Sequence, residues 1–477
     1  MAKHVEYENV GSEYLEHRQL KRGAAGWVLL AGLGVSYVIS GDFAGWNFGL
    51  AQGGWGGLLV ATILMGAMYT CMVFGLAELA AALPVAGAGY GFARRALGPL
   101  GGFATGIAIL VEYAIAPAAI VVFIGDYVQA LGLFGLTSSW PVYLVCYVLF
   151  VGVHLYGVGE ALRLMFVITG VAVVALVAFI VGMIPKFDSA KLFDIGDGSF
   201  LPMGVTGALG ALVYAIWFFL AVEGVPLAAE EARDPKKDMP RGIIGAMLAL
   251  LVFAALILVF APGGAGAKAL MSSGNPLPEA VRAAYGGDNF LAQLVNYVGL
   301  AGLVASFFSI IYAYSRQLFA LSRAGYLPRW LSKTGKRKTP YLALIVPGTI
   351  GFALASIMKS VDPLTGGARL INIAVFGAAL SYVLMMVSHI VLRVREPEMQ
   401  RPYRTPGGVV TTGVALVLAV AAVIATFFVD KIAAGVTAAI VIVALAYFWF
   451  YSRHHLVANA PEEEFAAIAR AEAELDD

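Results

Sequence analysis

Three acidic residues stand inside long apolar stretches of this 477-residue sequence. Asp42 lies within residues 26–49, Glu112 lies mid-way along another apolar stretch, and Glu223 lies near the end of a third. A carboxylate at the centre of a membrane helix costs about 2.5–3.5 kcal/mol on insertion scales. Such a residue is kept where it binds a ligand, carries a proton or pairs with another charge, so all three are candidate functional residues.

The neighbours of Asp42 predict a break in the helix that carries it. Gly41 and Gly45 bracket the acid, and glycine lets a backbone leave the helical conformation where it must approach a ligand. In lipid, an unwound backbone is tolerated only where it lines a cavity or is buried in protein. The stretch Ser40-Gly41-Asp42-Phe43 therefore predicts a substrate site on a discontinuous helix, the arrangement of many secondary transporters.

A second break is expected around Glu223, which is followed by Gly224 and, two residues later, by Pro226. Proline removes a helix hydrogen bond and glycine tolerates the resulting backbone. Interruptions in the first and sixth apolar segments are the sequence sign of an inverted repeat of five plus five helices.

The composition predicts a polytopic membrane protein of the all-α class. The chain is 60% hydrophobic and 13% charged, which excludes an ordinary soluble globule. Its two cysteines lie in apolar runs, so no disulfide framework, metal site or other cofactor is expected. A span needs about 20 apolar residues, and twelve segments are predicted to cross the membrane: 26–49, 58–83, 101–131, 142–156, 161–184, 205–228, 242–261, 291–319, 341–357, 371–392, 409–429 and 433–451.

The distribution of positive charge predicts that both termini are cytoplasmic. Most of the 31 lysine and arginine residues fall on the side of the N-terminus, and an even number of spans returns the C-terminus to that side. The opposite loops carry only Lys186, Lys191, Lys268, Arg282, Lys359, Arg369 and Lys431. The basic run 329–338 is interpreted as a cytoplasmic loop at the bilayer surface rather than a nucleic-acid patch.

The same pattern divides the chain into four parts. We expect a cytoplasmic N-terminal segment over residues 1–23, without a signal peptide, and a ten-helix transport core over 24–395. Two peripheral helices over 396–455 and an acidic cytoplasmic tail over 456–477 follow.

Several motifs resemble those of the amino acid–polyamine–organocation superfamily. Ser40-Gly41-Asp42-Phe43 looks like its Gly-Ser-Gly-hydrophobic-Phe signature. Residues 77–90 resemble the end of its second helix, and residues 230–242 and 323–328 resemble the loops after its sixth and eighth helices. Within the superfamily, residues 38–57 and 87–98 are similar to ethanolamine permeases. The resemblance implies twelve helices, a LeuT-like architecture, alternating access and a place in the bacterial inner membrane.

The resemblance also implies roles for the candidate residues. Asp42 stands where the superfamily usually has an aliphatic residue, and a fixed carboxylate there repels a substrate carboxylate and attracts an ammonium. Ethanolamine is therefore the expected substrate, with an amino acid or a polyamine as the alternative. In the related arginine/agmatine exchangers, the positions of Glu112 and Trp217 line and close the substrate cavity, and Glu223 is also a glutamate. Each could instead be structural.

Coupling to protons is predicted from the three acids together. Asp42, Glu112 and Glu223 would place like charges near one cavity, where they cannot all stay ionised, so at least one should hold a proton. A uniport driven by the membrane potential remains the alternative.

Three further polar residues are interpreted as structural. Glu78 and Glu230 stand near cytoplasmic ends of spans and are expected to pair with loop arginines, and His154 is expected to be a hydrogen-bonded histidine rather than a proton relay.

Overall fold

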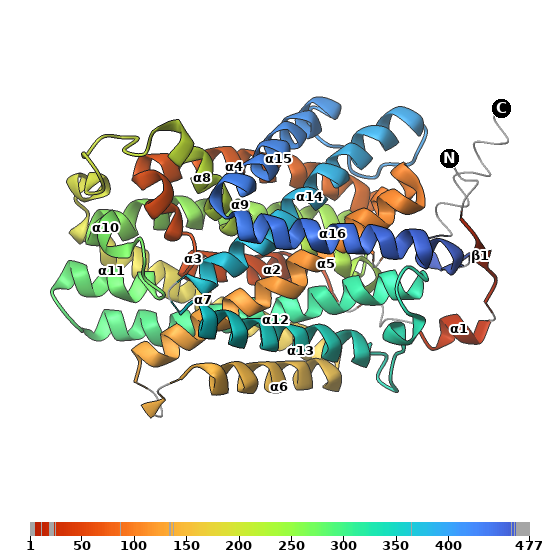
Figure 1. The fold of residues 1–477 in the computed structure, drawn as a ribbon, viewed down its shortest axis with the longest axis horizontal. Helices are drawn as coiled ribbons and strands as arrows, with labels where there is room; N and C mark the ends of the chain where they lie inside the picture. The colour runs from red at the N-terminus through yellow and green to blue at the C-terminus, as the bar shows by residue number, and fades with distance from the viewer. Residues whose placement is uncertain are drawn as a thin grey trace.

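The computed structural model describes residues 5–463, apart from residues 11, 19–22, 24, 86, 133–134, 137, 364, 459 and 462. The described part of the chain is mostly helical, with most helices running along the longest axis of the molecule (Figure 1). The expected acidic tail, 456–477, lies largely outside the described residues, as do parts of the N-terminal segment 1–23.

Ten helices of the described chain are long and apolar enough to cross a membrane, and two shorter apolar helices accompany them. The ten are built on α4 (Phe48–Ala82), α5 (Gly89–Ala130), α7 (Val158–Met183), α8 (Gly204–Trp217) with η4 (Val222–Glu231), α9 (Pro235–Ala265), α12 (Phe290–Arg323), α13 (Tyr341–Val361), α14 (Gly366–Arg395), α15 (Val409–Val429) and α16 (Lys431–Phe450). The two shorter ones are α2 (Trp27–Val38) with α3 (Ser40–Phe43), and α6 (Trp140–Tyr156).

Short elements connect these helices. They are α1 (Ser12–Glu16), η2 (Ile184–Lys186), η3 (Ser189–Phe193), α10 (Ala267–Leu270), α11 (Pro276–Tyr285), η5 (Arg329–Ser332) and η6 (Ser452–His454). Strands β1 (Tyr7–Glu8) and β2 (Leu456–Val457) form a small parallel pair that joins the two ends of the described chain.

Each of the twelve expected segments overlaps one of these apolar helices, ten of which are long enough to cross a membrane, and some boundaries differ. The first segment, 26–49, contains α2 and α3 and then the first two residues of α4, which kinks at Gly54 (φ +66°). The third begins earlier than expected, because α5 contains a short helix that ends at Gly98 (φ +82°) before Pro99. A left-handed φ suits glycine, which has no Cβ to clash with the backbone.

The central helices are buried and the outer ones expose apolar surface. Helix α5 packs along α14 and α12, and α4 packs along α8. Val148 on α6, Val417 on α15 and Val443 on α16 are exposed, as expected of side chains that meet lipid. The elements β1 and α1 lie at one end of the molecule, and α10 and α11 lie at the other (Figure 1).

Ion pairs link the helix ends and loops at the end of the molecule that carries β1 and β2. The fully buried Glu78 meets Arg393 at 2.6 Å, Arg401 at 2.9 Å and the amide of Thr405 at 2.7 Å. Glu230 meets Arg323 at 2.7 Å. Both expected pairings with arginines are therefore confirmed.

The other contacts at this end involve the terminal segments and α6. Glu8 of β1 pairs with Arg329 at 2.8 Å, and Glu463 is buried against Arg94. His154 Nδ1 lies 2.8 Å from the carbonyl of Phe150, as expected for a hydrogen-bonded histidine.

We expect Glu78→Gln to lower the free energy of unfolding by about 3 kcal/mol, because Arg393 and Arg401 lose the buried carboxylate that they share. Thermal unfolding of the purified protein in detergent measures this. Glu398→Gln removes an exposed acid from the same loop and should leave the melting temperature nearly unchanged. Equal shifts in the two variants would show that the Glu78 cluster does not stabilise the fold.

Candidate functional site

The first helix is interrupted directly after Phe43. Ala44 is extended (φ −161°, ψ 159°), and Gly45 has a left-handed φ of +98°. Asn47 holds the turn: its side-chain oxygen accepts from the Gly45 amide at 3.1 Å, and its amide donates to the carbonyls of Leu270 at 2.7 Å and Ser273 at 2.9 Å. These bonds satisfy backbone groups that lipid could not.

The second interruption follows Trp217, where α8 ends. Ala221 adopts the left-handed conformation (φ +79°), which costs a residue with a Cβ about 1–2 kcal/mol. The chain continues as the 3₁₀ segment η4, which contains Pro226. Such strained backbone persists where surrounding packing holds it in place, and it is concentrated at functional sites.

The two interruptions contact each other through Trp217. Its indole N–H donates to the carbonyl of Ala44 at 3.0 Å, and its own backbone carbonyl lies against Gly41. A Cβ at Gly41 would collide with that carbonyl oxygen, so glycine is required for this close approach. Trp217 therefore couples the ends of α3 and α8.

Asp42 is buried at this junction without a partner. Its exposed fraction is 0%, and neither carboxylate oxygen has a hydrogen-bond partner among the described residues. The flanking residues are well fixed: Ser40 Oγ lies 2.8 Å from Ser306 Oγ, and the Phe43 carbonyl accepts from the Tyr127 hydroxyl at 2.9 Å. An unpaired polar group held in a rigid, buried frame is costly to retain and calls for a ligand.

Glu112 and Glu223 form a pair that lies apart from Asp42. Their side chains are close enough to interact electrostatically, although neither oxygen of Glu112 has a hydrogen-bond partner among the described residues. Two neighbouring carboxylates in a buried site cannot both stay ionised, so we expect one of the two to hold a proton. No hydrogen bond or charge interaction in the described chain links either glutamate to Asp42. The expectation of three acids acting on one another is thus met for two of them only.

Three tyrosines surround the Glu112–Glu223 pair. The Tyr113 hydroxyl donates to Glu223 Oε1 at 3.2 Å, and the Tyr382 hydroxyl interacts with both glutamates. The hydroxyls of Tyr382 and Tyr69 lie 2.8 Å apart. Neutral hydroxyls can donate to a carboxylate or accept from a carboxyl, so they can serve the pair with or without its proton.

A buried ion pair lies at the last residue of η4, Glu231. Arg316 Nη2 lies 2.7 Å from Glu231 Oε1, and the Tyr312 hydroxyl donates to Glu231 Oε2 at 2.7 Å. The Tyr37 side chain interacts electrostatically with this pair and with Glu223. The positive charge of Arg316 is therefore matched by Glu231 and is not free to neutralise Glu223.

Sequence reasoning missed these tyrosines and the Glu231–Arg316 pair. Tyr113 follows Glu112 directly in the sequence, which was an available signal. Tyr69 and Tyr382 lie on distant helices and carry no local signal. Arg316 lies buried inside α12, where Glu231 compensates its charge.

Comparisons with known proteins identify the class to which this fold and site belong. The family model described as amino acid permease matches residues 28–462. The chain is a multi-pass membrane transporter and belongs to the amino acid permease family.

Two relatives illustrate the similarity. An uncharacterized transporter of Rhizobium meliloti (strain 1021) is 28% identical over 435 residues, which cover 89% of this chain and 90% of the relative. The branched-chain amino acid permease BcaP of Bacillus subtilis (strain 168) is 27% identical over 84% of this chain and 87% of its own. The first relative is named as a transporter and the second as a permease.

A solved structure supports the fold. A single-residue mutant of a manganese transporter from Eremococcus coleocola aligns over 99% of both chains with a TM-score of 0.55. At 16% identity, this likeness concerns the arrangement of the helices alone.

We expect Trp217→Phe to destabilise the protein by about 1–3 kcal/mol, because the buried carbonyl of Ala44 loses its donor. Trp46→Phe is the matched control. Trp46 is equally buried and stacks on Phe218, but its indole N–H has no partner in the described chain. Thermal unfolding of the two variants side by side measures the difference, and equal melting temperatures would contradict a role for the Trp217 hydrogen bond.

Proposed function

We propose that this protein is a secondary active transporter that takes up a small organic amine, ethanolamine in the first place, by alternating access. The transport core would be residues 24–395, built as a five-plus-five inverted repeat of the LeuT type within twelve spans. Residues 396–455 would form two peripheral helices. Both termini, 1–23 and 456–477, would lie in the cytoplasm of a bacterium, with the spans in the inner membrane.

The unpaired carboxylate of Asp42 carries this proposal. It lies at the interruption, between residues fixed by hydrogen bonds, and no described lysine or arginine neutralises it. An ammonium ligand supplies both the positive charge and the hydrogen-bond donors that a buried carboxylate lacks. Ser40, Gly41 and Phe43 would shape the site around it.

The backbone amides at the first interruption support an amine over an amino acid. Free amides at a broken helix are the groups that would hold a substrate carboxylate. Here the Ala44 amide donates to the Ser40 carbonyl at 3.0 Å, and the Gly45 amide donates to the Asn47 side chain. A substrate carboxylate would have to displace these bonds and lie beside the negative charge of Asp42.

Amino acid transport is the second candidate. Relatives that cover most of the chain include one named as a branched-chain amino acid permease, and the family itself is that of amino acid permeases. An α-amino acid also carries the ammonium that Asp42 would bind. The two candidates differ in whether the site accepts an α-carboxylate.

Trp217 is proposed to close the site. Its contact with both interruptions lets one side chain respond to a change in either. In Trp217→Phe, uptake of ethanolamine should slow more than equilibrium binding weakens, because a closing residue acts on conformational exchange. Equal losses in uptake rate and in binding affinity would show that Trp217 only lines the site.

Glu112 and Glu223 are proposed to couple transport to a proton. The two carboxyls interact electrostatically, so the pair is costly to ionise fully, and the uptake or release of one proton can accompany the change of access. Uniport driven by the membrane potential is the alternative, since one cation gains about 2.3 kcal/mol per 100 mV.

We expect Asp42→Asn to weaken ethanolamine binding at least about tenfold, which is about 1.4 kcal/mol, because the ammonium loses its counter-charge. Titration calorimetry on the purified protein measures this. Asp197→Asn removes one negative charge from an exposed loop and should bind as the parent does. Binding by Asp42→Asn within a factor of about two of the parent would exclude the carboxylate as a substrate contact.

We expect an inward proton gradient to raise ethanolamine accumulation in proteoliposomes at a fixed membrane potential. Glu112→Gln cannot release a proton but can still donate to Glu223, so it should keep binding and lose the dependence on the gradient. Accumulation by the parent protein that ignores the gradient, or that requires sodium, would refute proton coupling.

A further inference from the structure

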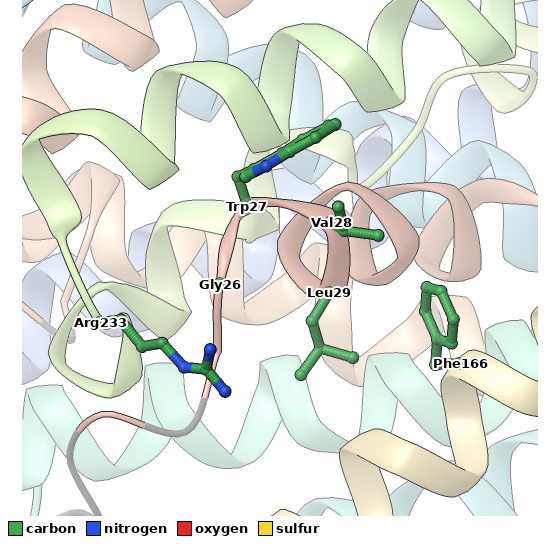
Figure 2. Close-up of a pocket in the computed structure, with 6 residues that line it drawn as sticks. All are labelled: Gly26, Trp27, Val28, Leu29, Phe166 and Arg233. Carbon is green, nitrogen blue, oxygen red and sulfur yellow. The ribbon is translucent and has the colours of Figure 1, made fainter.

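An open crevice of about 380 Å³ lies at the start of α2, away from the two interruptions. We call it the α2 crevice, and it is lined by Gly26, Trp27, Val28, Leu29, Phe166 and Arg233. Figure 2 shows Arg233 beside the extended backbone at Gly26, with Leu29 between it and Phe166 of α7.

The backbone fixes the position of Arg233 in the α2 crevice. Ala25 and Ala232 form an isolated parallel bridge, in which the Arg233 amide donates to the Ala25 carbonyl at 2.9 Å. The Ala25 amide in turn donates to the Glu231 carbonyl at 3.1 Å. The segment that leaves η4 is thus tied by its backbone to the stretch that precedes α2, which places Arg233 at the rim of the α2 crevice.

Phe166 forms the far wall. Its ring fits against Gly32 of α2, where a Cβ would lie only 2.8 Å from Phe166 Cε2. Even so, Phe166, Trp27 and Val28 remain 41%, 46% and 49% exposed. On a chain with ten candidate spans, such a surface faces lipid and not water.

The charge of the α2 crevice is positive and unpaired. Arg233 is exposed and makes no ion pair with any described residue, whereas the neighbouring Asp234 is engaged by Lys237 at 3.5 Å. An apolar slot that ends at an arginine, at the level where a helix enters the bilayer, has the chemistry of a site for a lipid with an acidic headgroup. Trp27 is a residue type that favours this interfacial level.

We propose that the α2 crevice binds an anionic phospholipid of the leaflet on the N-terminal side, with its phosphodiester on Arg233 and an acyl chain along Leu29 and Phe166. A guanidinium and a phosphate form paired hydrogen bonds. In a zwitterionic lipid, the cation of the headgroup competes with the guanidinium for the phosphate. This inference does not depend on which substrate is carried.

The site would act on transport through α2. That helix leads directly into α3 and Asp42, and it contacts α7 through Gly32 and Phe166. A lipid in the α2 crevice stabilises the contact of α2 with α7 and with the segment after η4. Anionic lipid should therefore stabilise the arrangement described here.

Titration of the delipidated full-length protein with phosphatidylglycerol or phosphatidylcholine, followed by thermal shift and native mass spectrometry, tests the proposal. The parent should reach half-saturation at roughly fivefold less phosphatidylglycerol than phosphatidylcholine, as about 1 kcal/mol for one basic contact implies. Arg233→Gln should abolish this preference, and Arg233→Lys should retain most of it.

Lys236→Gln is the matched control, because it removes an exposed charge from the same segment outside the α2 crevice. It should keep the preference of the parent. Equal loss in Arg233→Gln and Lys236→Gln would show a diffuse charge effect, and equal binding of the two lipids to the parent would show ordinary lipid contact. Either result overturns the proposal, and the melting temperature of each variant without lipid controls for misfolding.

Discussion

The structure depends on one constraint of the bilayer, that a backbone group freed from a helix must find a partner inside the protein. At the two interruptions, a residue of one supplies the hydrogen-bond partner for a backbone group of the other. Trp217 donates to the Ala44 carbonyl across the junction. Asn47, in the turn that follows Ala44, donates to the carbonyls of Leu270 and Ser273 beside α10. The close contact at Gly41 follows, because the two broken ends must approach within hydrogen-bonding distance. The interruptions of two separate helices thus form one junction in which these backbone groups have hydrogen-bond partners.

Buried charge obeys the same constraint, and the exception is informative. Glu78 and Glu231 each meet arginines, and Glu223 accepts a hydrogen bond from Tyr113 and lies beside Glu112. Asp42 has no hydrogen-bond partner in the described chain and, unlike Glu112, has no second acid beside it with which to share a proton. The missing partner of Asp42 is best supplied by the substrate. The negative charge of Asp42, rather than the fold, indicates that this partner is a cation.

The sequence predicted the helices well, because a membrane span is encoded locally in about 20 apolar residues. It also predicted both interruptions, since glycine and proline next to Asp42 and Glu223 are local signals. The meeting of Glu112 with Glu223 could be anticipated only through resemblance to known proteins. The Tyr69–Tyr382 contact and the Glu231–Arg316 pair could not, because they join residues from distant helices whose register is set by packing. The separation of Asp42 from the glutamates was likewise invisible in the sequence.

Equilibrium binding of ethanolamine and of serine to the same purified protein tests the central claim most directly. Serine differs from ethanolamine only by its α-carboxylate, so the comparison isolates the effect of placing a second negative charge beside Asp42. We predict that ethanolamine binds at least about tenfold more tightly than serine. Serine binding as tight as or tighter than that of ethanolamine would contradict the account and make the protein an amino acid carrier.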